Sequence, residues 1–283
     1  MESRVFILIP VYNRIETTKR GLKYLYHALN NTVNALGGGN FDVVVIDDGS
    51  TDGTSEWITA NYPEIVILKG DGNLWWSGGI NLGAAYAIEH HATHILLWND
   101  DIKPCEGYFN TLLYLTEKQG QDIIYGSKIV DEANGRIWFL GAHYFAYWGF
   151  VKHLRKHYDW CSPNCLTGMG TLLPMQVIEK IGYWDNENFP QYYGDIDFTY
   201  RAYRNGYRIK VEDGLLLYND TRLSSFNQER SIKKYWRSLF MTQSRYNIKK
   251  NILFQRKHAR LFTWWVGFVA KQIQYLFSLF LHR

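Results

Sequence analysis

The sequence is poor in cysteine and proline, with only three Cys and six Pro among 283 residues. Three is an odd number, and Cys161 and Cys165 have no second pair of Cys or His at the spacing of a zinc site. This argues against a disulfide framework and against a zinc finger, so we expect reduced thiols, as in cytosolic proteins. Before residue 228 there is no Pro-rich hinge, low-complexity linker or internal repeat. Residues 1–227 are therefore expected to form one domain.

Two common sequence signals are also missing. Residues 1–4 lead directly into a strand-like run, without the hydrophobic segment of a secretory signal, so we expect a cytoplasmic protein. The glycine-rich stretch at 70–83 does not contain G-x-G-x-x-G, the fingerprint of dinucleotide binding. This absence counts against an oxidoreductase that depends on such a cofactor.

The net charge of +4 conceals an uneven distribution. Residues 228–283 contain 12 Lys and Arg and one acid, Glu229, whereas the first 227 residues contain 19 basic and 26 acidic residues. The tail is thus strongly basic and the body is acidic. A basic tail indicates an anionic partner, for which phospholipid and nucleic acid are the candidates.

Short apolar runs alternate with helix-like segments through the first hundred residues. Strands are expected at 4–9, 42–46, 65–68 and 94–98, and helices at 15–30, 52–61 and 79–91. This alternation predicts an α/β fold with a parallel, doubly wound sheet. Right-handed crossovers would place the loops after the four strands at one edge of the sheet. Beyond residue 105 the pattern is irregular and rich in aromatic residues, as expected where a pocket is shaped.

Two pairs of aspartates follow two of these strands. Asp47 and Asp48 end the run at 43–46, and Asp100 and Asp101 follow the run at 95–99. Carboxylates at the carboxyl ends of parallel strands converge on one crevice, where a pair of acids suits a divalent cation and a phosphate. Either pair alone also fits an alternative, in which each Asp caps the helix that follows its strand.

Several motifs resemble, in order and spacing, those of glycosyltransferase family 2, the GT-A class of nucleotide-sugar enzymes. In the first half they are Pro-Val-Tyr-Asn-Arg at 10–14, Asp-Asp-Gly-Ser-Thr-Asp-Gly-Thr at 47–54 and Asn-Asp-Asp at 99–101. Stretches at 166–173, 181–185, 192–198 and 201–208 resemble the acceptor side of the family. Residues 72–83 are similar to the rhamnosyltransferase-like branch. The resemblance covers about residues 3–225.

The resemblance implies which residues bind the donor. The loop at 10–14 would line the nucleotide base and phosphates. Asp48 would accept a hydrogen bond from the N–H of a uracil or thymine ring, since a carboxylate can only accept. The expected donor-binding residues are Pro10, Val11, Tyr12, Arg14, Asp48, Asn73, Gly79 and Asp100.

The resemblance also implies a metal site, because Asn99-Asp100-Asp101 stands where the family has Asp-x-Asp. Asp101 is the expected ligand of Mn²⁺ or Mg²⁺, which would stabilise the charge that grows on the leaving diphosphate. The asparagine at the first position weakens coordination there. Family members often add a late histidine, but the matching stretch here offers only Asn219 and Asp220.

Asp195 is the expected general base, which would take the proton of the acceptor hydroxyl while its oxygen attacks the anomeric carbon opposite the diphosphate. One such displacement inverts the anomeric centre. The family usually has Glu-Asp at this point, and this chain has Gly194-Asp195, so the base is kept and its acidic neighbour is lost. The alternative is that Asp195 and Asp197 only cap a helix that begins here.

The basic tail predicts amphipathic helices. From Ile232 to Phe240 apolar side chains recur on one helical face, with basic residues elsewhere. Residues 261–281 are long and apolar enough to suggest a membrane span, but Lys271 lies near the middle and disfavours one. We expect these helices to lie on an anionic membrane surface, where Trp264, Trp265 and Phe268 would enter the interface. The alternatives are packing onto the body and formation of a homodimer.

The sequence thus predicts a GT-A catalytic domain at 1–227, with a Rossmann-like, mostly parallel sheet and an irregular acceptor-side half, and a helical appendage at 228–283. The expected activity is an inverting, metal-dependent transfer of one sugar from a UDP or dTDP donor to a glycan or lipid-linked acceptor in cell-surface polysaccharide synthesis. The enzyme would act at the inner face of the cell membrane and bind no nucleic acid. The alternatives are a nucleotidyltransferase acting on sugar phosphates and a non-catalytic membrane adaptor.

Overall fold

A computed structural model describes residues 3–36, 41–118, 122–156, 161–220, 236–244, 246–260 and 262–280. The first half forms the predicted parallel sheet, with spatial order β3-β2-β1-β4. Its strands are β1 (Val5–Val11), β2 (Phe41–Asp47), β3 (Val66–Lys69) and β4 (His94–Leu97). They are connected by α1 (Ile15–Leu36), α2 (Thr54–Asn61) and α3 (Trp75–Glu89). The expected strand and helix alternation is confirmed.

The second half extends the same sheet with strands of both directions. β10 (Thr171–Pro174) lies antiparallel to β4, and beyond it the order is β6-β11-β5. These strands are β6 (Ile123–Asp131), β11 (Arg208–Asn219) and β5 (Ile102–Pro104), with β7 (Ile137–Phe139) paired to β6. The helices of this half are α4 (Tyr108–Lys118), α5 (Met175–Ile181) and α6 (Gly194–Arg204). The mixed α/β sheet with an irregular second half agrees with the predicted fold class.

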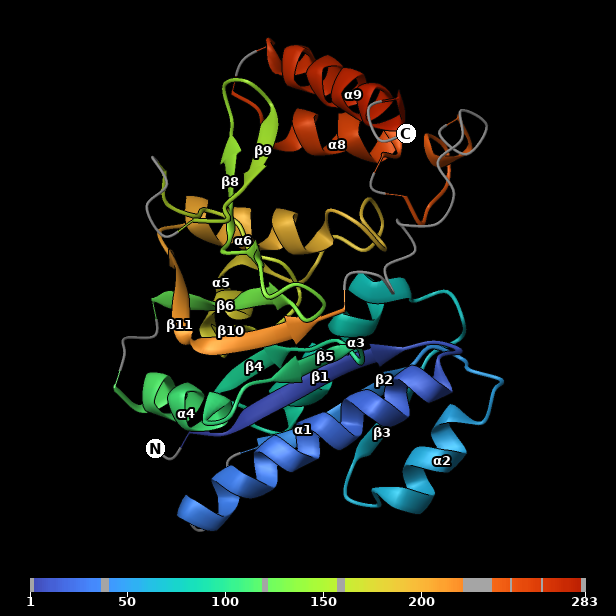
Figure 1. The fold of residues 1–283 in the computed structure, drawn as a ribbon, viewed down its shortest axis with the longest axis vertical. Helices are drawn as coiled ribbons and strands as arrows, with labels where there is room; N and C mark the ends of the chain where they lie inside the picture. The colour runs from blue at the N-terminus through green and yellow to red at the C-terminus, as the bar shows by residue number, and fades with distance from the viewer. Residues whose placement is uncertain are drawn as a thin grey trace.

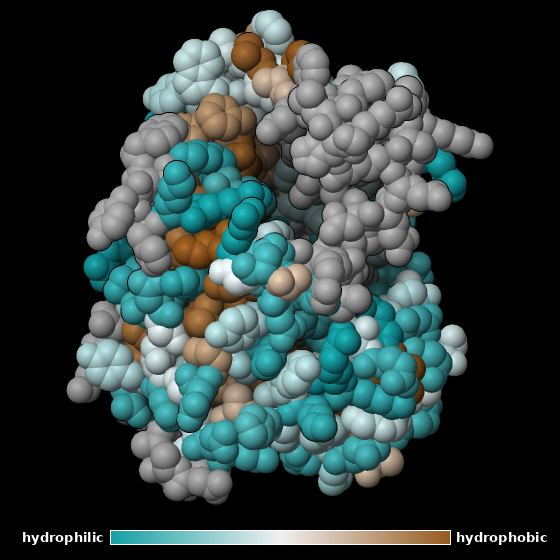
Figure 2. Space-filling model, viewed as in Figure 1, coloured by the Kyte–Doolittle hydropathy of each residue, from teal (hydrophilic) through white to brown (hydrophobic). Residues whose placement is uncertain are grey.

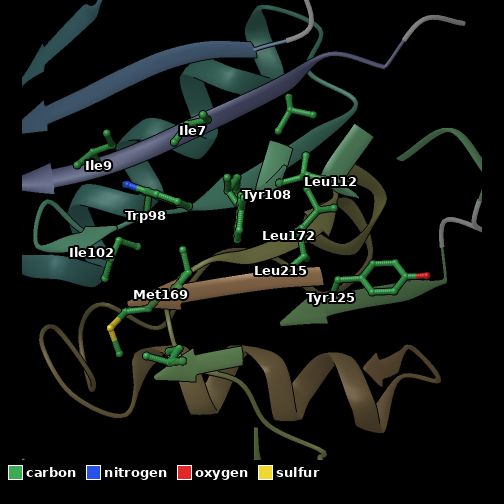
Figure 3. Packing of buried hydrophobic residues seen from close by; sticks show 14 of the residues in the cluster. Ile7, Ile9, Trp98, Ile102, Tyr108, Leu112, Tyr125, Met169, Leu172 and Leu215 are labelled. Atoms are coloured by element: carbon green, nitrogen blue, oxygen red, sulfur yellow. The ribbon is translucent and has the colours of Figure 1, made fainter. Parts of the chain in front are cut away.

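Helices cover both faces of the sheet (Figure 1). The core has two parts because side chains alternate along each buried strand. In β1, Ile7 and Ile9 belong to one cluster, whereas Phe6 and Leu8 belong to the other. Figure 3 shows the first cluster, in which Ile7 and Ile9 share a layer with Trp98, Tyr108 and Leu172. The strands are thus buried on both faces, and the predicted site lies at their carboxyl ends.

The C-terminal helices lie at one end of the molecule beside a hairpin (Figure 1). The hairpin consists of β8 (Ala142–Phe145) and β9 (Phe150–His153), and the helices are α8 (Ile248–His258) and α9 (Trp264–Phe280). Phe254 and Gln255 of α8 are buried, so this part of the basic tail packs onto the body. In the part of the chain that the structure describes, no helix is both long and apolar enough to cross a bilayer.

The predicted domain boundary at 227 lies outside the described residues, as do residues 232–235 of the expected amphipathic helix. Residues 236–238 form a helical turn, after which the chain turns at 239–240. The division into two domains therefore stays a prediction.

Candidate functional site

Asp48 organises the loop at the carboxyl end of β2. Its Oδ1 accepts hydrogen bonds from the backbone N–H groups of Gly72 (2.9 Å) and Leu74 (3.2 Å), and its Oδ2 accepts one from Trp75 (2.9 Å). A carboxylate is well placed here because the first N–H groups of α3 have no partner inside the helix. Trp75 has a φ of 56°, a left-handed backbone that this contact helps to hold. Asp48 is 7% exposed, so the structure gives it a positioning role, and its contact with a nucleotide base stays a prediction.

The neighbouring acids hold the loop after β2 and the start of α1. The N-cap of α2 is Gly53, without a side-chain hydrogen bond, so Asp47 does not cap the helix that follows its strand. Asp47 accepts hydrogen bonds from the backbone N–H of Ser50 (2.8 Å) and from the Ser55 hydroxyl. Asp52 accepts from the N–H of Ile15 (2.9 Å), which opens α1, and from Thr54. These contacts join the loops after β1 and β2, so that the two predicted donor-binding loops form one surface.

The predicted donor-binding residues of the first loop differ in accessibility. Pro10 and Val11 continue β1, and Val11 is buried in the core. Tyr12 is 52% exposed at the end of the strand. Asn73 is exposed in the glycine-rich loop. Gly79 is buried, where a Cβ would contact the Pro10 side chain at 3.5 Å. The exposed side chains of Tyr12 and Asn73 can meet a ligand, whereas Val11 and Gly79 are buried.

Arg14 bridges the two aspartates after β4. Its Nη1 lies 3.2 Å from Asp100 Oδ1, and its Nη2 lies 3.0 Å from Asp101 Oδ2. Asp100 is buried and also accepts a hydrogen bond from the Thr18 hydroxyl (3.0 Å). Burial raises the pKa of Asp100 to about 6, and the charge of Arg14 opposes this rise. The structure thus confirms that the loops after β1 and β4 meet, and it shows a cation already paired with both carboxylates.

The metal-binding prediction depends on Asp101. Its Oδ1 is buried and has no hydrogen-bond partner among the described residues, so it is the one oxygen of the pair left for another ligand. In the described ranges, no three His, Cys, Asp or Glu side chains gather closely enough to hold a metal ion. This sparse set fits Mg²⁺ or Mn²⁺ as such ions bind in nucleotide sites, through one or two carboxylates together with substrate phosphates and water. Asp101 fits the predicted role of ligand on this chemistry.

Asp195 lies in the first turn of α6. Its Oδ1 accepts from the N–H of Ile196 (2.8 Å) and its Oδ2 from the N–H of Gly168 (3.3 Å). The side chain is partly exposed. Burial raises the pKa of Asp195, and the backbone hydrogen bonds oppose that rise. A carboxylate that is both oriented and made more basic is suited to accept a proton.

The loop that precedes the helix of Asp195 adjoins the segment that binds Asp48. Trp75 donates to Asp48, and its neighbour Trp76 donates its backbone N–H to Gln191 Oε1 at 3.2 Å. A Cβ at Gly168 would overlap the ring of Trp76, so this glycine allows the tryptophan to pack against the loop that holds Asp195. The glycine-rich loop thus connects the predicted donor side with the predicted base.

The end of β4 adjoins the same region. The N–H of Gly170 donates to the carbonyl of Leu97 (2.8 Å), two residues before the Asn99-Asp100-Asp101 motif. Three predicted groups, at Asp48, Asp101 and Asp195, therefore lie along one edge of the sheet. Their roles in binding and catalysis stay predictions.

Sequence reasoning missed several residues of this region. Thr18 donates a hydrogen bond to Asp100, and Gln191 accepts one from the backbone N–H of Trp76, but nothing in the local sequence marks either residue. Asp197 is wholly buried against His258 of α8, at a separation of 61 residues. The only signal was the spacing of Asp195 and Asp197, which directs two acids of one helix to different sides.

Comparison with known proteins identifies the family. The model described as Glycosyl transferase family 2 matches residues 6–182, more than half of the chain. A curated relative from Haloferax volcanii, the "Low-salt glycan biosynthesis hexosyltransferase Agl10", is 25% identical over 179 residues. The match covers 59% of this chain and 55% of the relative, so the chain spans about half the length of that protein.

Solved structures share the fold at low sequence identity. GalNAc-T7, crystallised with UDP, GalNAc and Mn²⁺, has a TM-score of 0.61 at 12% identity over 98% of this chain and 58% of its own. The mannosyltransferase PcManGT from Pyrobaculum calidifontis, with GDP-Man and Mn²⁺, has a TM-score of 0.58 at 14% identity over 100% and 76%. TarS 1–349 from S. aureus, with UDP-GlcNAc, has a TM-score of 0.52 at 16% identity over 98% and 71%. These similarities establish the GT-A type of fold.

Proposed function

The chain belongs to glycosyl transferase family 2 and is a glycosyl-transferring enzyme, and from this premise we propose that it is an inverting, metal-dependent transferase. It would move one sugar from a UDP or dTDP donor to a glycan or lipid-linked acceptor in cell-surface polysaccharide synthesis. The observation that carries the proposal is the position of Asp195, a basic and oriented carboxylate in the first turn of α6. Gly168 holds its Oδ2, and the loop before α6 contacts Trp76, the neighbour of the Trp75 that binds Asp48. Solved proteins of this fold contain UDP, UDP-GlcNAc or GDP-Man, which supports a nucleotide-sugar donor.

The proposed step is a single displacement. The acceptor hydroxyl oxygen forms a bond to the anomeric carbon while the bond from that carbon to the donor phosphate oxygen breaks. The hydroxyl proton passes to Asp195, and the electron pair of the broken bond stays on the nucleoside diphosphate. Because the attack comes from the face opposite the leaving group, the anomeric configuration inverts. Asp195 then returns its proton to water.

The acids after β4 would serve the diphosphate. Asp101 would hold Mn²⁺ or Mg²⁺ through its unpartnered Oδ1. When bound, such an ion offsets the negative charge that develops on the leaving diphosphate. Arg14 adds a second positive charge beside it, and its planar fork suits phosphate oxygens as well as the carboxylates that it contacts here.

The product released from the donor tests this proposal. Purified protein with Mn²⁺ is incubated with UDP-glucose, UDP-GlcNAc, dTDP-rhamnose and GDP-mannose, and nucleotide products are separated and quantified. The proposal expects a nucleoside diphosphate from a UDP or dTDP sugar and loss of turnover with EDTA. A parallel incubation contains a nucleoside triphosphate and a sugar phosphate. Release of pyrophosphate there, with no diphosphate from any sugar nucleotide, would instead establish a nucleotidyltransferase.

We also propose that the C-terminal end attaches the enzyme to the inner face of the cell membrane. Phe262 and the α9 residues Trp265, Val269 and Ile273 recur every three or four positions and are exposed. Trp148 at the tip of the β8–β9 hairpin is exposed beside them, with its carbonyl accepting from Gly267 (3.1 Å). Figure 2 shows hydrophobic residues at this end of the molecule. An apolar patch on a basic tail suits the surface of an anionic bilayer.

Vesicle flotation tests the attachment. Full-length protein is expected to float with vesicles of phosphatidylcholine and phosphatidylglycerol, and Phe262→Ser with Trp265→Ser is expected to abolish flotation. Ile88→Ser, a matched change of an exposed apolar residue on α3, should leave it unchanged. A double variant that still floats contradicts the proposal. A wild-type dimer that this variant dissociates, without any flotation, would assign the patch to a homodimer.

A further inference from the structure

One face of α8 contacts the residue that precedes the first turn of α6. Asn251 and Phe254 are three positions apart and lie on the same side of the helix. The Asn251 side-chain amide donates to the Tyr193 hydroxyl (2.9 Å), and the ring centroids of Phe254 and Tyr193 are 5.3 Å apart. Tyr193 has a φ of 73°, in the left-handed region that is unfavourable for a non-glycine residue. The contacts from α8 hold this strained residue two positions before Asp195.

The same face of α8 also contacts the residue two positions after Asp195. His258 Nε2 lies 2.7 Å from Asp197 Oδ1, and Lys257 Nζ lies 2.8 Å from the same oxygen. Arg201 Nε binds the other oxygen at 2.9 Å. Burial alone raises the pKa of Asp197, but the hydrogen bond from His258 and the charges of Arg201 and Lys257 hold it below the usual value. Asp197 is therefore an anionic acceptor, and His258 donates to it.

These contacts bear on Asp195 because its orientation depends on the first turn of α6. Oδ1 of Asp195 accepts from the N–H of the next residue, Ile196. The N–H of Asp197 donates to the carbonyl of Tyr193 (2.7 Å), which closes the turn around Asp195. A buried carboxylate that loses a donor must find another partner or move toward water. Loosening Asp197 would therefore turn the carboxylate of Asp195 as well.

We infer that α8 is a positioning element of the active site, in which His258 and Lys257 hold the catalytic base Asp195 through Asp197. The inference rests on the proposed role of Asp195. It assigns part of the basic tail to catalysis: Lys257 also binds Asp185 at 2.7 Å, so its charge is directed into the protein. Figure 1 shows α8 and α6 as neighbours, although α8 is the penultimate helix of the chain.

The chain offers a matched control on the same helix. Gln255 is as deeply buried as His258, but it binds the hairpin side: it donates to the carbonyl of Gly149 (2.7 Å) and accepts from the Tyr144 hydroxyl (2.7 Å). Gln255→Leu removes two buried hydrogen bonds of α8 to the hairpin and leaves the hydrogen bonds between α8 and α6 in place. If a variant loses amide protection or turnover only because α8 docks more weakly, Gln255→Leu should show the same loss.

The first experiment measures amide hydrogen exchange in the full chain without ligand. His258→Phe and the milder Lys257→Gln are expected to speed exchange of the Asp197 amide by about tenfold or more, because its turn opens more often. Lys257→Arg, which keeps the positive charge, should retain the wild-type protection of the Asp197 amide. Gln255→Leu should leave exchange at Asp197 within about twofold of the wild type. Unchanged exchange in both Lys257→Gln and His258→Phe would overturn the inference, as would an equal effect of Gln255→Leu.

The second experiment measures turnover of the sugar nucleotide that the wild type uses fastest among UDP-glucose, UDP-GlcNAc, dTDP-rhamnose and GDP-mannose. Lys257→Gln and His258→Phe should lower kcat about tenfold or more with donor KM within about twofold, since a turned base slows the chemistry and spares donor binding. A wild-type kcat in both Lys257→Gln and His258→Phe, together with loss of turnover in Asp195→Asn, would overturn this inference and leave the proposed role of Asp195 intact. Full turnover in Asp195→Asn overturns the role of Asp195 and the inference with it.

Discussion

Arg14 Nη2 lies 3.0 Å from Asp101 Oδ2, so the cation of the first loop is paired with the carboxylate proposed to hold a metal. The same guanidinium contacts Asp100. Two adjacent carboxylates repel each other unless a positive charge lies between them. Arg14 supplies that charge in the protein alone, and the donor with its metal would share it.

Replacing Arg14 tests whether the donor and its metal share the positive charge of this residue. Arg14→Ala should raise donor KM about tenfold or more, because a charge-assisted phosphate contact is lost. Arg14→Lys keeps the charge without the planar fork, so its effect should be intermediate. Affinity for Mn²⁺ alone, measured by calorimetry, should not fall in Arg14→Ala, since a competing cation has been removed. Unchanged donor KM in Arg14→Ala would exclude Arg14 from the donor site.

Asp101 should control the metal dependence. EDTA should abolish turnover in the wild type, and Mn²⁺ should restore it. In Asp101→Asn, half-maximal rescue should need about tenfold more Mn²⁺ or more, because a neutral amide oxygen binds a hard cation less well than a carboxylate. Titration of activity with Mn²⁺ measures this shift. Equal Mn²⁺ requirements in the two proteins would remove Asp101 as a ligand.

Gly21 of α1 packs against the backbone of Asp100, so a change at Gly21 should affect both the stability of the protein and the position of the acids after β4. A Cβ at Gly21 would overlap the backbone carbonyl of Asp100, so this glycine lets α1 pack directly on the loop after β4. Alanine normally stabilises a helix relative to glycine by about 1 kcal/mol. Gly21→Ala should instead lower the free energy of unfolding by about 1–3 kcal/mol, because the overlap forces the backbone to move.

Urea denaturation measures whether the free energy of unfolding falls in Gly21→Ala. Asn30→Ala, at an exposed position of the same helix, is the control, because its effect should follow helix propensity alone. Donor turnover should fall in Gly21→Ala, since Asp100 would be displaced together with its neighbour Asp101. A more stable and fully active Gly21→Ala protein would show that the contact has no consequence.

His94 should make stability depend on pH at the far end of β4. Burial lowers its pKa to about 4, whereas an unfolded histidine titrates near 6.5. Below about pH 6.5 the unfolded chain binds this proton and the folded chain does not, so the contribution is present above pH 6.5 and is lost as the pH falls toward 4. The loss should amount to about 3 kcal/mol at most.

Thermal unfolding between pH 4 and 7.5 measures the effect, since His94→Asn should flatten the fall in Tm relative to the wild type. Parallel curves for the two proteins would show that His94 titrates normally. Turnover at pH 7.5 should be the same in both proteins, because His94 begins β4 and the proposed site lies beyond its end.

The first half of the fold follows from periodicity. Branched apolar runs such as residues 5–9 favour buried strands over helices, and their alternation with helices predicted that these strands are parallel. The first strand was predicted at 4–9, but β1 continues through Pro10 to Val11. Pro10 is tolerated because β4 pairs with β1 only as far as Leu8, so no ladder donor is missing on that side.

The second half of the fold could not be predicted from local sequence patterns. β10 enters the sheet antiparallel between β4 and β6, a pairing fixed by long-range packing and by no turn in the sequence. The charge count of the tail also gave no information on which basic side chains bind groups within the protein. Lys250 is buried and donates to the carbonyl of Thr242 (2.7 Å), and burial lowers its pKa to about 8, while Lys257 binds Asp197. Composition indicated an anionic partner, and part of that partner is the body itself.

Asp195→Asn tests the central claim most directly. The amide keeps the shape of the side chain but cannot take a proton from the acceptor hydroxyl. Sugar transfer and donor affinity are measured side by side in the wild type and in this variant. The account predicts that kcat falls by about a hundredfold or more while the fold and donor affinity are kept. A variant that transfers sugar at the wild-type rate would contradict it.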